Sequence, residues 1–251
     1  MSQELHGKVA IVTGASRGLG ESVATVLAGR GAAVALNTFA SPERAAATVD
    51  RIRSGGGRAA VFRADVRDES DVSRMVAEVE RTLGPIDVAV LNATGPQPFL
   101  GIEELTWRAC LDQLEFFVKS PLLIARAVVP GMKKRRYGRI INIGSEAFER
   151  GVPRFSQYVA AKGAQLGLTR SWAMELAEWN ITVNLVAPGW IPTERHEGDS
   201  QEMKDAYAAA VPMKRMGVPT DVAQAVAFLA GEGAGFITGQ KISVNGGNTL
   251  E

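Results

Sequence analysis

Short apolar runs alternate with longer amphipathic segments along the whole chain. The apolar runs predict strands at 8–13, 32–37, 59–63, 86–92, 139–144, 181–187 and 240–244. The segments between them predict helices at 21–28, 42–53, 69–83 and 221–230, a helix that begins near 155, and either two helices or one broken helix over 102–134, with Pro121 early in the second. Strands and helices that alternate through short connections are typical of an α/β fold, a doubly wound parallel sheet of about seven strands with helices on both faces.

Length and composition narrow the class of protein. The 251 residues suit one large α/β domain, which we place at 1–251. A net charge of +1 argues against a nucleic-acid partner, and no apolar stretch approaches the roughly 20 residues that a membrane span needs. Cys110 is the only cysteine, and Met1 to His6 carries no signal-peptide core, so we expect a reducing, cytoplasmic location. Two scattered histidines offer no metal-ligand spacing.

A glycine-rich turn joins the first predicted strand to the first predicted helix. Strand, glycine turn and helix form the context in which backbone amides bind a dinucleotide pyrophosphate. Gly14 would allow a tight turn, Gly18 would let the backbone approach the phosphates, and Gly20 would let the helix and strand pack closely. A plain strand-to-helix turn is the alternative. The predicted cofactor residues in this turn are Gly14, Ser16, Arg17, Gly18, Leu19 and Gly20.

The end of the second predicted strand bears on which dinucleotide binds. An NAD-specific protein usually places an acidic residue there to hold the ribose 2′-hydroxyl. Here the strand ends at Asn37 and Thr38, and the first acidic residue after them is Glu43. Arg17 in the glycine turn would favour a 2′-phosphate, although it could be an ordinary surface arginine. We therefore expect NADP(H) to be preferred over NAD(H).

A second group of polar residues follows the fifth predicted strand. Ser145 comes where that strand ends, and Tyr158 and Lys162 lie four residues apart, on one face of the next helix. An ammonium one turn away would favour the phenolate and lower the pKa of Tyr158, so that the tyrosine could exchange a proton with a carbonyl oxygen. A tyrosine and a lysine at this spacing are also common on solvated helix faces.

The segment 190–216 is polar, charged and long, with helical potential over 201–210, and we interpret it as a substrate lid. Four aromatic residues could line an apolar substrate pocket, or some of them could belong to the core. These are Phe99, Phe148, Phe155 and Trp190.

Together these motifs resemble the short-chain dehydrogenase/reductase family over nearly the whole chain, and within it the 3-oxoacyl-[acyl-carrier-protein] reductases. The resemblance implies a single Rossmann-type domain, a homotetramer, and an NADPH-dependent reduction of a ketone, free or bound to a carrier protein. It implies that Tyr158 is the general acid, that Lys162 holds the nicotinamide ribose, and that Ser145 binds the substrate carbonyl. It also implies a second set of cofactor contacts, at Asp65, Val66, Asn92, Ala93, Pro188, Gly189, Ile191 and Thr193.

The chain departs from the family pattern at two places. The sequence after the fourth predicted strand reads Leu91-Asn92-Ala93-Thr94, where the family usually has Asn-Asn-Ala-Gly. Phe117 stands where many members have a catalytic asparagine that supports a water relay to the lysine. A phenyl ring makes no such bonds. Two alternatives to the reductase therefore stay open: a secondary-alcohol dehydrogenase of the same family, and a non-catalytic NADP(H)-binding protein.

Overall fold

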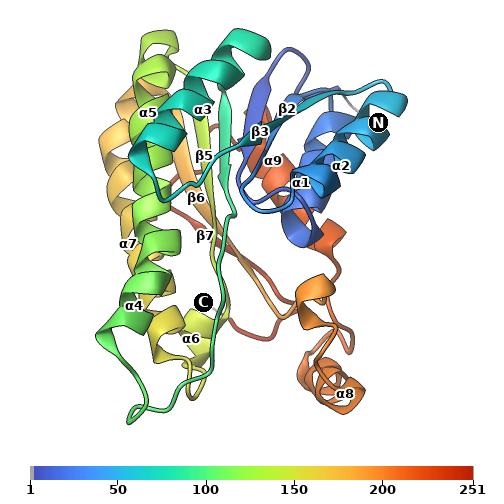
Figure 1. Ribbon diagram of the computed structural model, residues 1–251, viewed down its shortest axis with the longest axis vertical. Coiled ribbons are helices and arrows are strands. Elements are labelled where there is room, and N and C mark those ends of the chain that lie inside the picture. Colours follow the sequence, from blue (N-terminus) through green and yellow to red (C-terminus); the bar gives the residue numbers. More distant parts are fainter. Residues whose placement is uncertain (1–2, 251) are drawn as a thin grey trace.

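The computed structural model describes residues 3–250, which form one seven-stranded parallel sheet between two layers of helices (Figure 1). The strand order is β3-β2-β1-β4-β5-β6-β7. This confirms the predicted doubly wound α/β fold of the Rossmann type. The strands are β1 Val9–Val12, β2 Ala33–Thr38, β3 Arg58–Arg63, β4 Val88–Leu91, β5 Gly138–Ile143, β6 Ile181–Pro188 and β7 Lys241–Val244.

The helices cover both faces of the sheet, and each face has its own apolar core. One core joins α1, α2 and α9 to the sheet, and the other joins α3, α5 and α7 to the opposite face (Figure 1). Because both faces are covered, β1, β2, β4, β5 and β6 are buried along their full length, which explains their nearly continuous apolar sequences. The α-helices are α1 Gly18–Gly29, α2 Pro42–Ser54, α3 Glu69–Thr82, α4 Trp107–Leu114, α5 Ser120–Arg135, α6 Ala147–Arg150, α7 Ser156–Leu176, α8 Gln201–Ala210 and α9 Pro219–Ala230.

The predicted broken helix over 102–134 consists of α4, a π-helical turn and α5. The π-helical turn, η1 Glu115–Lys119, joins the two helices without a loop, and Pro121 lies in the first turn of α5 as expected. A π-helical turn adds a residue to the helix and re-aims the side chains within it. Phe117 lies in this turn and is buried, at 2% exposure.

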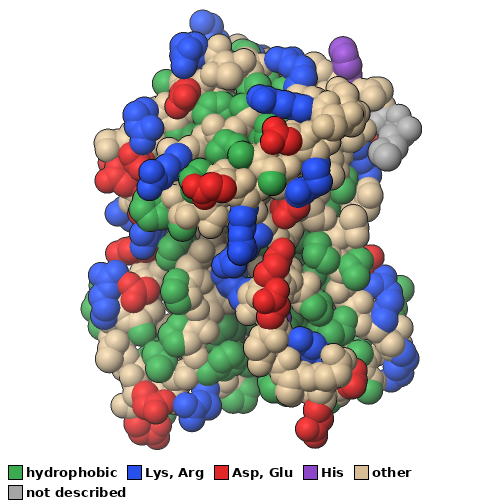
Figure 2. Space-filling model, turned by 45° about the vertical axis from the view of Figure 1, so that its right-hand side comes forward, with side chains coloured by type: hydrophobic (Ala, Val, Ile, Leu, Met, Phe, Trp, Pro, Cys, Tyr) green, Lys and Arg blue, Asp and Glu red, His purple; other side chains and the backbone are tan. Residues whose placement is uncertain are grey.

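The segment 190–216 lies beyond the carboxyl ends of the strands. It contains the short helix η3 Glu194–His196 and the helix α8, which has the bounds expected from the sequence (Figure 1). The short helix α6, which begins two residues after Ser145, had no counterpart among the predicted elements. Figure 2 shows acidic and basic side chains intermixed over the face drawn, in keeping with the net charge of +1.

The core at the centre of the sheet should be sensitive to lost volume. Ile141 on β5 is 1% exposed, so Ile141→Ala would leave a cavity and should lower the free energy of unfolding by about 2–5 kcal/mol. Ile102→Ala makes the same chemical change at a side chain that is 73% exposed and should cost less than about 0.5 kcal/mol. Denaturant unfolding of both variants tests this, and equal losses would contradict it.

Candidate active site

Three loops meet where β1, β4 and β2 end, and Thr13 joins two of them. The Thr13 hydroxyl accepts hydrogen bonds from the backbone amides of Asn92 (2.9 Å) and Ala93 (3.0 Å). The Asn92 amide group in turn donates to the carbonyls of Thr13 (2.9 Å) and Gly14 (3.2 Å). Parallel pairing of β1 with β4 brings these residues together, because the carboxyl ends of parallel strands share one edge of the sheet.

The glycine turn has the shape that a dinucleotide needs. Gly14 (φ +65°) and Gly18 (φ +57°) adopt left-handed backbone conformations. A Cβ at Gly20 would lie 2.4 Å from the Gly14 carbonyl oxygen and 2.6 Å from the Asn92 amide nitrogen, so only glycine fits there. The turn leads directly into α1, whose free N-terminal amides favour an anion. The residues present therefore fit a pyrophosphate held against Gly18 and Leu19.

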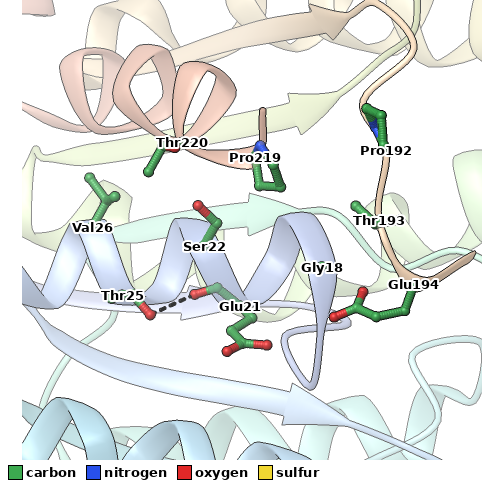
Figure 3. Close-up of a pocket in the computed structure, with 10 residues that line it drawn as sticks. All are labelled: Gly18, Glu21, Ser22, Thr25, Val26, Pro192, Thr193, Glu194, Pro219 and Thr220. Carbon is green, nitrogen blue, oxygen red and sulfur yellow. Dashed lines mark hydrogen bonds between the residues drawn. The ribbon is translucent and has the colours of Figure 1, made fainter. Parts of the chain in front are cut away.

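The loop after β6 lies against the glycine turn. Residues 192–194 and the start of α9 line, with α1, an open cavity of about 500 Å³ (Figure 3). A Cβ on Gly18 would lie 3.3 Å from side-chain atoms of both Thr193 and Glu194. The predicted contacts Gly189, Ile191 and Thr193 thus belong to a loop that follows Pro188, the last residue of β6, and reaches the glycine turn, where Thr193 and Glu194 lie beside Gly18 (Figure 3).

Two predicted cofactor residues at the end of β2 use their side chains within the protein. Asn37 is 2% exposed, and its side-chain oxygen accepts from the Gly14 amide (3.2 Å) while its nitrogen donates to the Ala64 carbonyl (3.1 Å). The Thr38 hydroxyl accepts from the Ser41 amide (3.3 Å). Asn37 therefore ties the glycine turn to the neighbouring strands, a structural role that the sequence did not indicate.

Several charged side chains lie close to the end of β3. Arg67 makes a two-pronged ion pair with Asp65 (2.9 and 2.7 Å), which lowers the pKa of that carboxyl, and Val66 beside it is buried. A second cavity, of about 400 Å³, is lined by Phe39, Arg63, Asp71 and Arg74. Phe39 directly follows Thr38, so this cavity lies beside the end of β2. Arg74 is paired with Asp71 (2.6 Å), and Arg63 adds positive charge there. Arg17 is exposed in the glycine turn.

Ser145, Tyr158 and Lys162 come together as the sequence predicted. The Ser145 hydroxyl accepts a hydrogen bond from the Ala147 amide (3.1 Å) and lies near the Tyr158 hydroxyl, where it acts to lower the pKa of that tyrosine. Tyr158 and Lys162 are both buried, at 9% and 4% exposure. The Lys162 ammonium donates to the Ile143 carbonyl (2.6 Å) and to the side-chain oxygen of Gln165 (3.1 Å). A proton donor, a second hydroxyl and a cation therefore share one end of the sheet.

The expected pKa of Tyr158 was wrong in direction. Burial raises the pKa of Tyr158 above its ordinary value, and the Ser145 hydroxyl and the charge of Arg195 offset this only in part. Burial likewise holds the pKa of Lys162 well below its ordinary value. The Lys162 ammonium lies 5.6 Å from the Tyr158 ring centre and is bound to oxygens on β5 and α7, so the lysine does not dominate the tyrosine's titration.

Aromatic rings surround Tyr158. Phe155 stacks on it (4.4 Å between ring centres), Phe99 stacks on Phe155 (4.5 Å), and Phe117 meets Tyr158 edge-on (5.3 Å). Phe99 is 59% exposed, so the row leads from the surface to Tyr158. Phe148 instead covers Gly163, and Trp190 contacts Tyr207 and His196 in the segment 190–216. Of the four aromatic residues proposed for a pocket, Phe155 thus contacts Tyr158 directly and Phe99 reaches it through Phe155.

A buried carboxylate next to Ser145 ties the segment 190–216 to the site, and the sequence analysis missed it. Glu146, 4% exposed, accepts hydrogen bonds from Tyr207 on α8 (2.7 Å) and from Asn248 (3.0 Å to each oxygen). The Trp190 amide donates to the same Tyr207 hydroxyl (2.8 Å). Burial and the bond to Glu146 raise the pKa of Tyr207 to about 12, so its hydroxyl stays protonated. No sequence pattern links residues so far apart along the chain.

Within residues 3–250, no group of three or more histidine, cysteine, aspartate and glutamate side chains is arranged to hold a metal ion. The same part of the chain contains no helix long and apolar enough to cross a membrane.

Comparison with known proteins identifies the class to which this fold and site belong. The family model for enoyl-(acyl carrier protein) reductases matches residues 14–249. The chain belongs to the short-chain dehydrogenase/reductase family, and it is an NAD(P)-dependent oxidoreductase.

Particular relatives give a finer picture. The 3-oxoacyl-[acyl-carrier-protein] reductase of Staphylococcus aureus is 40% identical over 242 residues, 96% of this chain and 97% of that protein. A structure of such a reductase from Agrobacterium tumefaciens with NADP bound is 33% identical, with a TM-score of 0.91, and the match covers 98% of this chain and 95% of that one. A putative gluconate dehydrogenase from the same species is 33% identical, with a TM-score of 0.94 and complete coverage of both chains.

The bond between α8 and Glu146 should hold the segment 190–216 in place. Tyr207→Phe removes a hydroxyl that both donates and accepts a hydrogen bond, and it should cost about 1 kcal/mol of stability and speed proteolysis within 190–216. The control is Tyr137→Phe. The Tyr137 hydroxyl is buried and has no hydrogen-bond partner among the described residues, so its removal should leave both properties unchanged. Equal proteolysis rates for the two variants would contradict this role.

Proposed function

We propose that this protein is an NADPH-dependent carbonyl reductase that acts on a 3-oxoacyl thioester or a related ketone with an apolar flank. One observation carries the proposal: Tyr158 and Lys162 lie buried one helical turn apart on α7, and Ser145 lies near the Tyr158 hydroxyl, at the sheet edge where the glycine turn also lies. Bound NADPH would supply the hydride. The chain's own residues would then have to orient the carbonyl and provide its proton.

The protein's residues suit those tasks. Tyr158 would donate the proton to the carbonyl oxygen. Its phenol is protonated at neutral pH, but burial raises its pKa and so makes it a weaker acid, which the charge of Lys162 would offset. Ser145 would hold the same oxygen, because its hydroxyl lies near that of Tyr158. Lys162 would hold the nicotinamide ribose. Its charge would also stabilise the phenolate that remains after proton transfer.

The aromatic row supports an apolar group beside the reacting carbonyl. Phe99 and Phe155 form a continuous surface from solvent to Tyr158, against which an acyl chain or ring could lie. The acyl-carrier-protein substrate named for the S. aureus relative agrees with such a group. A sugar-acid alcohol, suggested by the name of the A. tumefaciens dehydrogenase, would find few polar partners on that surface. Oxidation of a secondary alcohol by the same residues is the second candidate.

We propose that NADP(H) is preferred over NAD(H). The end of β2 carries no acidic side chain, Arg63 lines the cavity beside it, and Arg17 lies in the glycine turn that Gly14 connects to Asn37. Relatives with NADP or NADPH bound support the same choice.

We also propose that the enzyme is a homotetramer that works in the cytoplasm. On α7, Ala160, Ala164 and Gly167 are exposed at helical spacing, and Met174 continues the row at 85% exposure. Small exposed residues on one helix face would let a second copy of the helix approach closely. The reducing environment of the cytoplasm agrees with Cys110 being a free thiol.

Removing the proposed proton donor should abolish turnover but not cofactor binding. Tyr158→Phe should lower kcat for NADPH-dependent reduction of an acetoacetyl thioester by about 10²–10⁴-fold, while NADPH fluorescence titration gives an unchanged Kd. Absorbance at the reduced-nicotinamide band measures the turnover. A wild-type protein that binds NADPH tightly and reduces no ketone in a broad panel would instead support the non-catalytic alternative. Faster alcohol oxidation than ketone reduction at matched cofactor would support the dehydrogenase.

Arg17 should discriminate between the two cofactors. Arg17→Ala removes a cation from the glycine turn, so KM for NADPH should rise by roughly tenfold while KM for NADH changes little. The control is Arg81→Ala, which changes an exposed arginine in the last turn of α3. It should alter neither KM. Equal effects of Arg17→Ala on both cofactors would show that this arginine does not read the 2′-phosphate.

A further inference from the structure

A buried polar row runs along α7 from the catalytic tyrosine into the core. Tyr158, Lys162, Gln165 and Thr169 recur every three or four residues, so they share one helix face. α7 packs on β6, and hydrogen bonds from this face reach Asn142 and Ile143 on the neighbouring strand β5. Gln165 is 1% exposed and Thr169 is 0% exposed. Buried polar groups cost free energy unless they are hydrogen-bonded, so a row that leads away from the substrate calls for an explanation.

The hydrogen bonds in this row form a closed ring that orients the Gln165 amide. The Thr169 hydroxyl gives its one proton to the Gln165 backbone carbonyl (2.9 Å) and accepts from the Asn142 amide nitrogen (3.0 Å). The Asn142 oxygen therefore faces Gln165 and accepts from its side-chain nitrogen (3.4 Å). The remaining side-chain atom of Gln165 is its oxygen, and it faces Lys162 (3.1 Å).

The Gln165 oxygen is important because Phe117, on another side of the Lys162 ammonium, offers no hydrogen-bond acceptor. The Lys162 ammonium lies 3.7 Å from the centre of the Phe117 ring, so one side of the buried charge meets a phenyl face instead of a hydrogen-bond acceptor. A ring face attracts a cation more weakly than a well-placed oxygen does. The oxygens bound to the ammonium are the Ile143 carbonyl and Gln165, and only Gln165 can be changed without altering the backbone.

We propose that Gln165 is a positioning residue for the reaction: its side-chain oxygen, fixed by Asn142 and Thr169, keeps the Lys162 ammonium charged and oriented beside Tyr158 in a site where Phe117 offers no hydrogen bond. The charged groups that act on Lys162 are Arg195, from the loop after β6, and Tyr158 when ionised; its other neighbours, Phe117 on η1 and Ile143 on β5, are uncharged. The catalytic part of this role rests on the proposed reductase function.

The test measures Lys162 directly, so that it does not depend on turnover. In protein labelled with [13Cε]lysine, the resonance that disappears in Lys162→Met reports the titration of Lys162. Gln165→Met keeps the side-chain length but removes the acceptor, so the titration midpoint of Lys162 should fall by about one pH unit. Gln165→Glu restores an oxygen and should return the midpoint to the wild-type value or above it. With acetoacetyl thioester and NADPH, kcat of Gln165→Met should fall roughly tenfold.

A matched control separates positioning from a general loss of stability. Gln113 is also a buried glutamine, 2% exposed, whose side chain donates to the Pro96 carbonyl (2.9 Å). Gln113→Met should lower the melting temperature as Gln165→Met does, and it should leave the Lys162 midpoint unchanged.

The possible outcomes test the positioning role of Gln165 separately from the proposed reductase function. A Lys162 midpoint that stays the same in Gln165→Met would overturn the positioning role, whatever the turnover. A midpoint that falls only in Gln165→Met, together with a loss of kcat, would support it. If the midpoint falls but wild-type protein reduces no ketone, the coupling of Gln165 to Lys162 stands, whereas the proposed reductase function fails.

Discussion

Parallel pairing in the middle of the sheet is the constraint on which the site depends. β1, β4, β5 and β6 lie side by side in register, so the loops that follow them leave the sheet at one edge. The glycine turn, Asn92 and Ala93, Ser145, and the loop from Pro188 to Thr193 all leave from that edge. A parallel sheet that is buried on both faces cannot shift its strand register without exposing apolar side chains. The relative positions of these loops therefore follow from the core.

Burial also sets the chemistry of the site. Tyr158 and Lys162 lie on a helix that packs on β6, and both are buried, so each is pushed toward its neutral form. A neutral tyrosine suits a proton donor. A neutral lysine would lose its electrostatic value, so the oxygens around Lys162 carry the task of keeping it charged. On the same helix, Tyr158 therefore has to stay neutral while Lys162, one turn away, has to stay charged.

The loop and helix beyond the strands are attached to the site through Glu146. Its carboxylate binds Tyr207 on α8 and Asn248 near the end of the chain, and it directly follows Ser145. The position of the segment 190–216 is therefore linked to the backbone beside Ser145. The Tyr207 hydroxyl also accepts from the Trp190 amide, so one buried carboxylate and one hydroxyl hold both ends of this segment's contact with the site.

Sequence patterns alone determined the seven strands, most of the helices, the glycine turn and the grouping of Ser145, Tyr158 and Lys162. These features depend on local periodicity and on the rule that parallel strands end at one edge, both of which can be read along the chain. The short helix α6 and the π-helical turn at Phe117 were missed because they depend on how neighbouring elements pack. The internal use of Asn37 and Thr38 was missed for the same reason.

Only the tertiary structure decided which atoms face one another inside the core. The spacing of Tyr158 and Lys162 is local, but the direction of the lysine ammonium depends on Ile143, Gln165 and Phe117, which come from three different elements. The pKa of Tyr158 moved opposite to the expected direction because desolvation depends on the total burial by all elements, and no pattern of residues along one helix records it.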